Sequence, residues 1–181
     1  MSANLPASVR LRDATAADLE AMHRIYAHHV LCSAASFELT PPDLEEFSRR
    51  IQAVRDAGLP WIVAEAEGEV KGYAYASTYR PRPAYRFTVE DSVYVDPSAQ
   101  RRGIGSELLK AVIKAATAAG KRQMLAVITR SANSGSVALH EKLGFRHVGT
   151  LAEVGFKFDC WLDTLLMQRP LIEQSEPRQR E

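Results

Sequence analysis

The sequence has few cysteines, no long apolar run and almost no net charge, and each absence argues against a class of protein. Its two cysteines, Cys32 and Cys160, form no C-x-x-C pair, so a metal or redox site has almost no support. No apolar run approaches the roughly 20 residues that a membrane helix needs. The formal net charge is +1, from 23 basic and 22 acidic residues, whereas nucleic-acid-binding proteins usually carry a clustered basic face. We therefore expect no metal, no membrane and no nucleic acid as partners.

The N-terminus also lacks the charged-then-apolar layout of a secretory signal, so the expected location is cytoplasmic, where thiols stay reduced. The 181 residues, 46% hydrophobic and 25% charged, suit one compact domain. We expect an N-terminal extension over residues 1–8 and a single domain over residues 9–171. The chain becomes polar and charged after Pro170, which predicts a disordered tail over residues 172–181.

Helix signals appear twice in the first third of the chain. Thr15 stands three residues before Asp18, a spacing typical of a capping box at a helix start. A second helix is predicted to begin at Thr40-Pro41, because proline is tolerated in a first turn. Gly58 suits the left-handed residue just beyond the end of that helix.

Alternating and β-branched patterns predict the strands. The predicted strands cover residues 9–12, 61–65, 70–77, 88–95, 124–128, 145–151 and 157–167. Two further helices are predicted, one from Ile104 to a stop at Gly120 and one over residues 133–143. The strands group in the first half and alternate with helices in the second. This order indicates one domain of the α/β (α+β) class.

A glycine-containing loop runs from the predicted strand 88–95 directly into the helix that begins at Ile104. Gly103 and Gly105 let backbone N–H groups approach a ligand, and a helix N-terminus favours an anion. The segment fails both the dinucleotide fingerprint and the P-loop, because Leu108 stands where each motif needs glycine. A diphosphate is therefore the predicted ligand, and a fortuitously glycine-rich helix start is the alternative.

The loop Gln100-Arg101-Arg102-Gly103-Ile104-Gly105 resembles the Q/R-x-x-G-x-G/A loop of the GCN5-related N-acetyltransferase (GNAT) superfamily. The resemblance implies a single GNAT-type domain with a mixed, mostly antiparallel sheet flanked by helices, and acetyl-CoA as cosubstrate. The pyrophosphate contacts that it implies are Arg101, Arg102, Gly103, Ile104, Gly105 and Ser106. The implied contacts of the pantetheine arm and the thioester are Val93, Tyr94 and Val95.

A later segment resembles the same superfamily, with an asparagine that opens a helix and a Gly-Phe pair that closes it. Here these are Asn133 and Gly144-Phe145. The resemblance implies that Asn133 and Ser136 contact the cofactor, although Asn133 is also explained as a plain helix cap.

One branch of the superfamily is resembled more closely, the phosphinothricin and methionine sulfoximine N-acetyltransferases. The matching residues are Arg82, Tyr85, Thr88, Glu90, Val93-Tyr94-Val95, His140-Glu141, Gly144 and Gly155-Phe156-Lys157. The likeness extends from about Val9 to about Leu171 and is weak over residues 31–55. It implies a small amino-acid-like amine as substrate, a homodimer, and a role in detoxification or herbicide resistance.

Acetyl transfer to an amine needs a base, a polarised thioester and a proton for the departing thiolate. Glu90 is the candidate base, since the resembling enzymes use a glutamate there; the alternative is that it only holds an arginine. His140 stands where many superfamily members carry a tyrosine. Because histidine exchanges a proton near neutral pH, His140 is predicted to protonate the thiolate or assist Glu90, with packing as the alternative. The N–H of Val95 is the candidate donor to the developing oxyanion.

Arginines in a proline-containing loop suit a carboxylate or phosphinate on the substrate. The predicted substrate-binding residues are Phe37, Arg80, Arg82, Tyr85, Glu90, Ser92 and Lys157, of which Phe37, Ser92 and Lys157 come from the resemblance alone. Acetylation of a protein N-terminus and a non-catalytic acyl-CoA sensor remain alternative functions. His28 and His29 are adjacent on a helix, so they cannot share a metal; we interpret both as surface or core residues.

Overall fold

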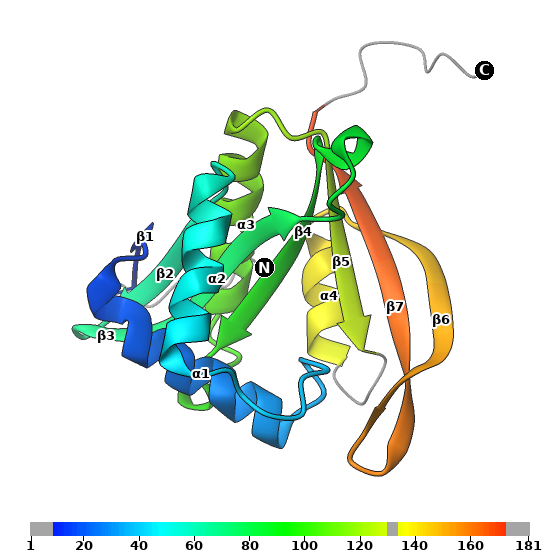
Figure 1. The fold of residues 1–181 in the computed structure, drawn as a ribbon. Coiled ribbons are helices and arrows are strands. Elements are labelled where there is room, and N and C mark those ends of the chain that lie inside the picture. Colours follow the sequence, from blue (N-terminus) through cyan, green and yellow to red (C-terminus); the bar gives the residue numbers. More distant parts are fainter. Residues whose placement is uncertain (1–8, 130–133, 173–181) are drawn as a thin grey trace.

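The fold is described by a computed structural model that covers residues 9–129 and 134–172 (Figure 1). The strands are β1 (Arg10–Asp13), β2 (Trp61–Ala66), β3 (Glu69–Thr78), β4 (Thr88–Val95), β5 (Gln123–Thr129), β6 (Arg146–Lys157) and β7 (Cys160–Pro170). The α-helices are α1 (Leu19–Cys32), α2 (Leu44–Asp56), α3 (Ile104–Ala118) and α4 (Ser134–Lys142).

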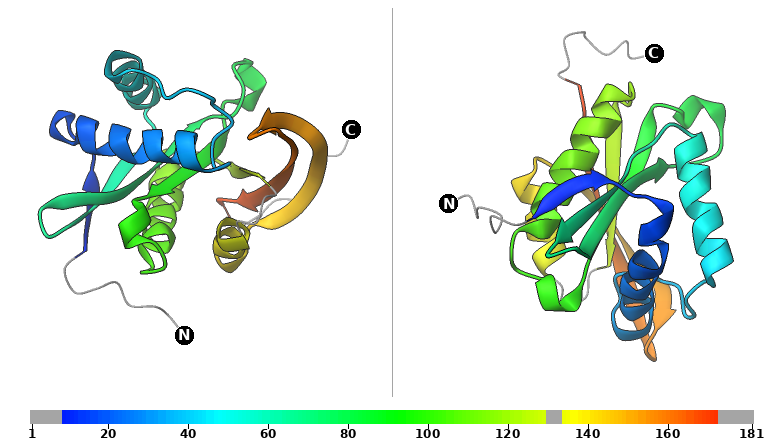
Figure 2. Two further views of the ribbon diagram at one scale, coloured as in Figure 1. Left: turned by 90° about the horizontal axis from the view of Figure 1, so that it is seen from below. Right: turned by 90° about the vertical axis from the view of Figure 1, so that its left-hand side faces the viewer.

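The strands form one seven-stranded sheet in the order β1-β2-β3-β4-β5-β7-β6. Every neighbouring pair is antiparallel except β4 and β5, which run parallel. Figure 2 shows α1 and α2 on one face of the sheet and α3 and α4 on the other. This architecture confirms the predicted α/β class with a mixed, mostly antiparallel sheet flanked by helices.

The sheet is open at its centre, because β4 and β5 stay paired for only a short distance. Thr88, Val89 and Glu90 pair with residues 123–125 of β5, and the rest of β4 pairs with β3 but not with β5. The two strands diverge beyond Glu90, as Figure 1 shows. The divergence leaves one edge of β4 without a strand partner in the middle of the domain.

Helix α3 anchors this region through one continuous apolar stripe. Leu108, Leu109 and Val112 are fully buried against the sheet, at the spacing of three and four residues that one helix face requires. Each such side chain contributes about 1.5–3 kcal/mol on burial. Gly72 on β3 leaves room for its neighbours, because a Cβ there would lie 2.9 Å from the carbonyl oxygen of Tyr94 and 3.3 Å from Cδ1 of Leu108 on α3.

Most predicted elements are confirmed, including the capping box, in which Thr15 N–H donates to Asp18 Oδ2 at 2.7 Å. The predicted start of the second helix at Thr40-Pro41 is wrong. Helix α2 begins at Leu44, and Asp43 caps it by accepting from Glu46 N–H at 2.8 Å. A residue before a proline avoids helical backbone. The side-chain carboxylate of aspartate also accepts a hydrogen bond from an unpaired N–H at the helix start, which a proline side chain cannot do.

The boundaries of the last two strands are also corrected. Strand β6 continues to Lys157, six residues beyond the predicted end at Leu151, and β7 begins only at Cys160. Phe158 and Asp159 form the turn between them with φ values of 54° and 57°. Neither residue is a glycine, so the sequence carries no clear signal for this left-handed turn.

No helix in the described ranges is both long and apolar enough to cross a membrane. Both cysteines are exposed and free. Within residues 9–129 and 134–172, no three His, Cys, Asp or Glu side chains are grouped to hold a metal ion.

Candidate active site

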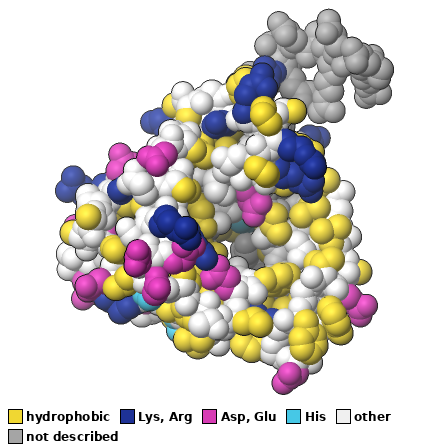
Figure 3. Space-filling model, viewed as in Figure 1, with side chains coloured by type: hydrophobic (Ala, Val, Ile, Leu, Met, Phe, Trp, Pro, Cys, Tyr) yellow, Lys and Arg dark blue, Asp and Glu magenta, His cyan; other side chains and the backbone are white. Residues whose placement is uncertain are grey.

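The divergence of β4 and β5 opens into a cavity of about 850 Å³, a volume typical of small-molecule sites. Figure 3 shows the molecule hollowed near the middle of this face. The walls come from β4, β5, the segment that joins α1 to α2, the N-terminus of α3, and α4. The residues that line the cavity include His29, Ser36, Phe37, Tyr75, Glu90, Asp91, Ser92, Ser106, Thr129, Ser136 and His140.

The start of α3 forms the anion-binding end of the cavity. Gly103 occupies the N-cap with a φ of 82°, a left-handed conformation that glycine adopts without strain. The N–H groups of Ser106 and Glu107 donate to the carbonyl oxygen of Gly103, whereas those of Ile104 and Gly105 precede the first acceptor of the helix, at the positive end of its dipole. Arg101 and Arg102 are exposed beside them. The hydroxyl of Ser106 is buried and finds no partner among the described residues, which fits a ligand that brings a hydrogen-bonding oxygen.

The free edge of β4 leads from this anion site toward Glu90. Val93 and Val95 face α3, since a Cβ at Gly105 would lie 3.6–3.7 Å from their side chains. Tyr94 faces α1, with its ring 5.1 Å from that of Tyr26. Because β3 pairs with only one edge of β4, alternate main-chain groups on the other edge are available to an extended ligand. The predicted pantetheine-binding stretch therefore has the backbone geometry that such an arm requires.

Glu90 is half-buried in the cavity wall, at the last pair of the β4–β5 ladder. Burial raises the pKa of its carboxyl group, and the neighbouring charge of Asp91 raises it further. No arginine forms an ion pair with Glu90 in the described part of the chain. A carboxylate in this state is poised to accept a proton.

His140 is buried on α4, and both nitrogens of its ring have acceptors. Nδ1–H donates to the carbonyl oxygen of Ser136 at 2.7 Å, and Nε2 lies 2.9 Å from Asp91 Oδ2. Since a carbonyl and a carboxylate only accept, this geometry favours the imidazolium form. Burial acts to lower the pKa of His140, but the hydrogen bond and charge of Asp91, aided by the Ser136 carbonyl, raise it overall. The two acceptors and the raised pKa both favour the protonated form of His140 at the cavity wall.

Asp91 is a site residue that sequence reasoning missed. It is 7% exposed, its Oδ2 binds His140, and its Oδ1 has no partner among the described residues. The signal was present in the adjacent acidic pair Glu90-Asp91. Successive residues of a strand point to opposite faces, so two acids within a central strand place one carboxylate on each side of the sheet.

His29 is the second residue that the sequence interpretation missed. His28 is exposed as expected, but His29 lines the cavity as well as being buried. Its Nε2–H donates to the carbonyl oxygen of Val95 at 2.9 Å. Burial lowers the pKa of His29, which favours the neutral ring, and its hydrogen bond holds the end of β4 at Val95.

The predicted substrate residues fall into two groups. Phe37, Glu90 and Ser92 line the cavity. Arg80, Arg82 and Tyr85 lie outside its lining, on the segment that leads into β4, where the guanidinium of Arg80 stacks over the Tyr85 ring at 5.8 Å. Lys157 is also outside the lining, with its Nζ on two main-chain carbonyls. Of the two predicted cofactor contacts in the later segment, Ser136 lines the cavity and Asn133 lies outside the described residues.

One cavity thus brings together a helix start suited to an anion, an open strand edge and two titratable side chains, Glu90 and His140. The model of the acetyltransferase (GNAT) family matches residues 22–145. The phosphinothricin N-acetyltransferase of Alcaligenes faecalis is 52% identical over 154 residues, which is 85% of this chain and 78% of that protein. The L-methionine sulfoximine/L-methionine sulfone acetyltransferase of Salmonella typhimurium is 39% identical over 92% of this chain and 97% of its own length.

Solved structures agree with these relatives. A phosphinothricin acetyltransferase from Sinorhizobium meliloti in complex with AcCoA matches with a TM-score of 0.89 and 46% identity, covering 95% of this chain and 94% of that one. A ribosomal-protein-alanine N-acetyltransferase from Brucella melitensis matches with a TM-score of 0.86 and 40% identity, covering 89% and 99%. The chain belongs to the GNAT acetyltransferase family and is an acetyl-CoA-dependent N-acetyltransferase.

Proposed function

We propose that this enzyme acetylates the amino group of a small, acidic, amino-acid-like substrate of the phosphinothricin or methionine sulfoximine type. The observation that carries the proposal is Glu90, a half-buried carboxylate without a cationic partner in the described part of the chain, at the point where β4 and β5 separate. The names of the two relatives support this acceptor class.

Glu90 acts as the general base. Bound acetyl-CoA supplies the acetyl group as a thioester, which only a neutral amine attacks. Because the pKa of Glu90 is raised, it lies closer to the pKa of the amine. The smaller difference eases proton transfer from the amine to Glu90, directly or through one water. Ser92 and Tyr75, paired opposite each other on β4 and β3, flank the same face. General-base catalysis of this kind is worth roughly 10²–10⁴-fold in rate.

His140 acts on the opposite face of β4. Glu90 points toward the side of α1 and α2 by strand alternation, whereas Asp91 and His140 meet on the side of α3 and α4. His140 holds its Nε2 proton there with Asp91 and supplies it where the thiol is released. The two faces of β4 keep Glu90, which takes a proton, apart from His140, which gives one.

The acidic end of the substrate is the proposed ligand of the arginine segment before β4. Arg80 and Arg82 precede Thr88, the first residue of the strand that carries Glu90. They are exposed, so their paired N–H groups are available to a carboxylate or phosphinate.

A homodimer is the proposed assembly. Strand β6 is an edge of the sheet, and its exposed face with the start of β7 is unusually apolar. The exposed side chains are Val148, Leu151, Val154, Phe156 and Trp161. A contiguous apolar patch on an edge strand is typical of an interface, and a second copy of the chain covers it in this proposal. Sedimentation equilibrium tests it, and a Trp161→Lys variant is expected to shift the dimer to monomer.

Acetylation of a protein N-terminus is the second candidate, supported by the name of the Brucella melitensis relative. The test is thiol release from acetyl-CoA with a panel of phosphinothricin, methionine sulfoximine, common amino acids, polyamines and a peptide with an N-terminal alanine. Turnover of the first two supports the proposal. Turnover of the peptide alone overturns it, and binding of acetyl-CoA without turnover of any acceptor favours a sensor.

A further inference from the structure

One wall of the cavity is made by residues 33–37, which follow α1 and have no regular secondary structure. Ala35, Ser36 and Phe37 line the cavity from this segment. A wall without its own backbone ladder keeps its shape only through contacts with the rest of the fold. The contacts of this segment therefore decide which acceptor the cavity admits.

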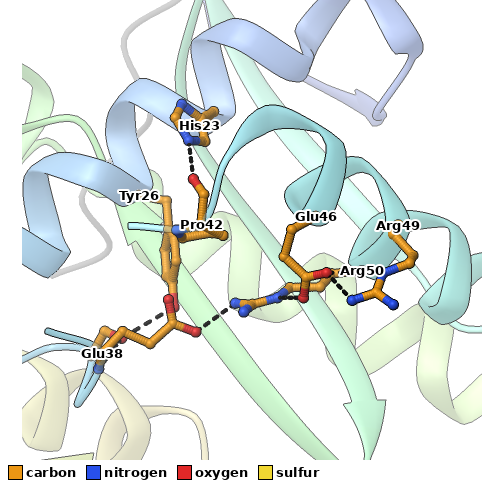
Figure 4. Close-up of polar contacts among 8 residues, drawn as sticks. His23, Tyr26, Glu38, Pro42, Glu46, Arg49 and Arg50 are labelled. Carbon is orange, nitrogen blue, oxygen red and sulfur yellow. Dashed lines mark hydrogen bonds and ion pairs between the residues drawn. The ribbon is translucent and has the colours of Figure 1, made fainter. Parts of the chain in front are cut away.

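The outer side of the connection is tied to α1 and α2 (Figure 4). His23 Nε2–H donates to the carbonyl oxygen of Pro42 at 2.7 Å, and the hydroxyls of Tyr26 and Ser36 lie 3.1 Å apart. Arg50 binds Glu38 at 2.6 Å. These contacts hold the part of the connection nearest α2. At its other end, the N–H and the hydroxyl of Ser33 donate to the carbonyl oxygen of His29 at 3.1 and 2.9 Å.

The inner side is held by strands from the far end of the chain. Thr129 Oγ1 at the end of β5 donates to the carbonyl oxygen of Ala34 at 2.6 Å. Lys157 at the end of β6 donates from Nζ to the carbonyl oxygens of Ser33 at 2.9 Å and Ser36 at 2.7 Å. Three of the four carbonyl groups from Ser33 to Ser36 are thus bound by side chains of β5 and β6.

Phe37 completes the contact by packing on Gly155 of β6. A Cβ at Gly155 would overlap the Phe37 ring, so only glycine at this position admits the ring where it lies. Gly155 follows a shift of register between β6 and β7, which is where backbones often bend at functional sites. Lys157 follows Gly155 by two residues, on the same face of β6. The two residues contact neighbouring parts of the segment 33–37.

Lys157 is an unusual residue for a purely structural contact. It is 4% exposed, although lysine is rarely buried without an ionic partner, and no carboxylate forms an ion pair with it in the described part of the chain. Two carbonyl oxygens accept its hydrogen bonds, its Nζ lies 5.0 Å from the centre of the Phe158 ring, and the charge of Glu38 acts on it without forming an ion pair. The segment that Lys157 holds lines the cavity, and a positive charge at a site of low polarity attracts an anion over several ångströms.

We propose that Lys157 is a positioning residue for the acceptor, which clamps residues 33–37 in place with Thr129 and Gly155 and biases the cavity toward small anionic amines. This role differs from the direct substrate contact that the sequence predicted for Lys157. It rests on the proposed function for the identity of the acceptor, but the clamping itself does not. In the described part of the chain, the hydrogen bonds of the clamp go to residues 33–36 and none goes to α3 or α4.

The first test is the Lys157→Met variant, which keeps most of the aliphatic stem and removes the charge and its hydrogen bonds. The KM for the anionic amine is expected to rise about tenfold, a typical loss for a charged hydrogen bond, with kcat less affected and acetyl-CoA affinity unchanged. Thr129→Val, which is isosteric, is expected to give a smaller rise in the same direction. Lys110→Met, at an exposed lysine on α3, is the matched control. Equal losses in acceptor KM and acetyl-CoA affinity would overturn the proposal.

The second test needs no substrate, so it separates failure of the clamp from failure of the proposed function. Amide hydrogen exchange is measured over residues 33–40 and over α3 in the native enzyme and each variant. Lys157→Met is expected to accelerate exchange over residues 33–40 at least several-fold and to leave α3 unchanged, and Lys157→Arg is expected to restore part of the protection. Unchanged exchange over residues 33–40 would refute the clamp, even in a fully active enzyme. If Lys157→Met accelerates exchange but the native enzyme acetylates none of the amines tested, only the proposed acceptor is refuted.

Discussion

Two adjacent carboxylates on β4 have opposite surroundings. Asp91 faces α4, where His140 lies 2.9 Å away and supplies a positive charge. Glu90 faces the other side of the sheet, where burial raises its pKa and no cation in the described ranges offsets the cost. Successive residues of a strand point to opposite faces of the sheet. A shift of one position along β4 therefore separates an acid in a stabilising ion pair from a buried base without one. Two substitutions, with five expected outcomes, test how far these two roles are separate.

The largest expected effect is on turnover by Glu90→Gln. The amide keeps the size of the side chain but accepts no proton, so kcat is expected to fall by roughly 10²–10⁴-fold. Steady-state kinetics measures this, and calorimetry checks that acetyl-CoA still binds with unchanged affinity. Glu20→Gln, at an exposed position of α1, is the control. A Glu90→Gln enzyme with native turnover would remove Glu90 from the mechanism.

Asp91→Asn is expected to have the largest effect on stability. Removing one partner of a buried ion pair leaves the other without compensation, which typically costs about 3–5 kcal/mol in the free energy of unfolding. Urea denaturation measures the loss, with Asp56→Asn at an exposed site of α2 as control. A change no larger than that of the control would show that the pair carries no stability.

The same variant is expected to alter two pH dependences. His140 has a pKa raised in the folded state, so its contribution to stability is full below the unfolded pKa and is lost as pH rises through the folded pKa. The melting temperature of the native enzyme should therefore fall with rising pH in this range, and that slope should disappear in Asp91→Asn.

Asp91 also raises the pKa of Glu90. The acidic limb of the kcat/KM profile should accordingly move to lower pH in Asp91→Asn. An unmoved limb, in a variant that is folded, would show that the two faces of β4 do not interact.

The smallest expected effect is a gain in stability in Glu90→Gln. A carboxyl group whose pKa is raised by folding stabilises the fold only while it is protonated, and this contribution is lost as pH rises through the folded pKa. Replacing it should add about 1 kcal/mol to the free energy of unfolding near neutral pH. The gain should shrink in acid. A loss of stability instead would mean that Glu90 makes a favourable contact in the folded state.

Much of the fold was predictable because its signals are local. The capping box at Thr15 and the strand from Thr88 to Val95 follow from short-range patterns, and both are confirmed. The errors occur where two local preferences compete or a residue breaks its usual preference. Asp43 prevails over Pro41 as the helix start, and Phe158 adopts a positive φ that favours glycine.

The candidate site divides in the same way. The loop before α3 was readable because glycines, arginines and a helix start follow one another in the chain. Asp91 and His29 were missed because their roles depend on partners at His140 and Val95, which are 49 and 66 residues away. A residue-by-residue pattern contains no information about which distant side chain a buried acid meets.

The sequence by itself determined the family, the anion-binding helix start and the order of strands and helices, because each depends on neighbours within a few residues. Only the tertiary structure decided that Asp91 pairs with His140 and that Lys157 reaches Ser33 across 124 positions of the chain. These contacts arise when strands and helices are packed together, and the packing fixes distances that no local spacing encodes. The same packing placed Glu90 and Asp91 on opposite faces of the open sheet, where Asp91 meets His140 and Glu90 meets no cation in the described part of the chain.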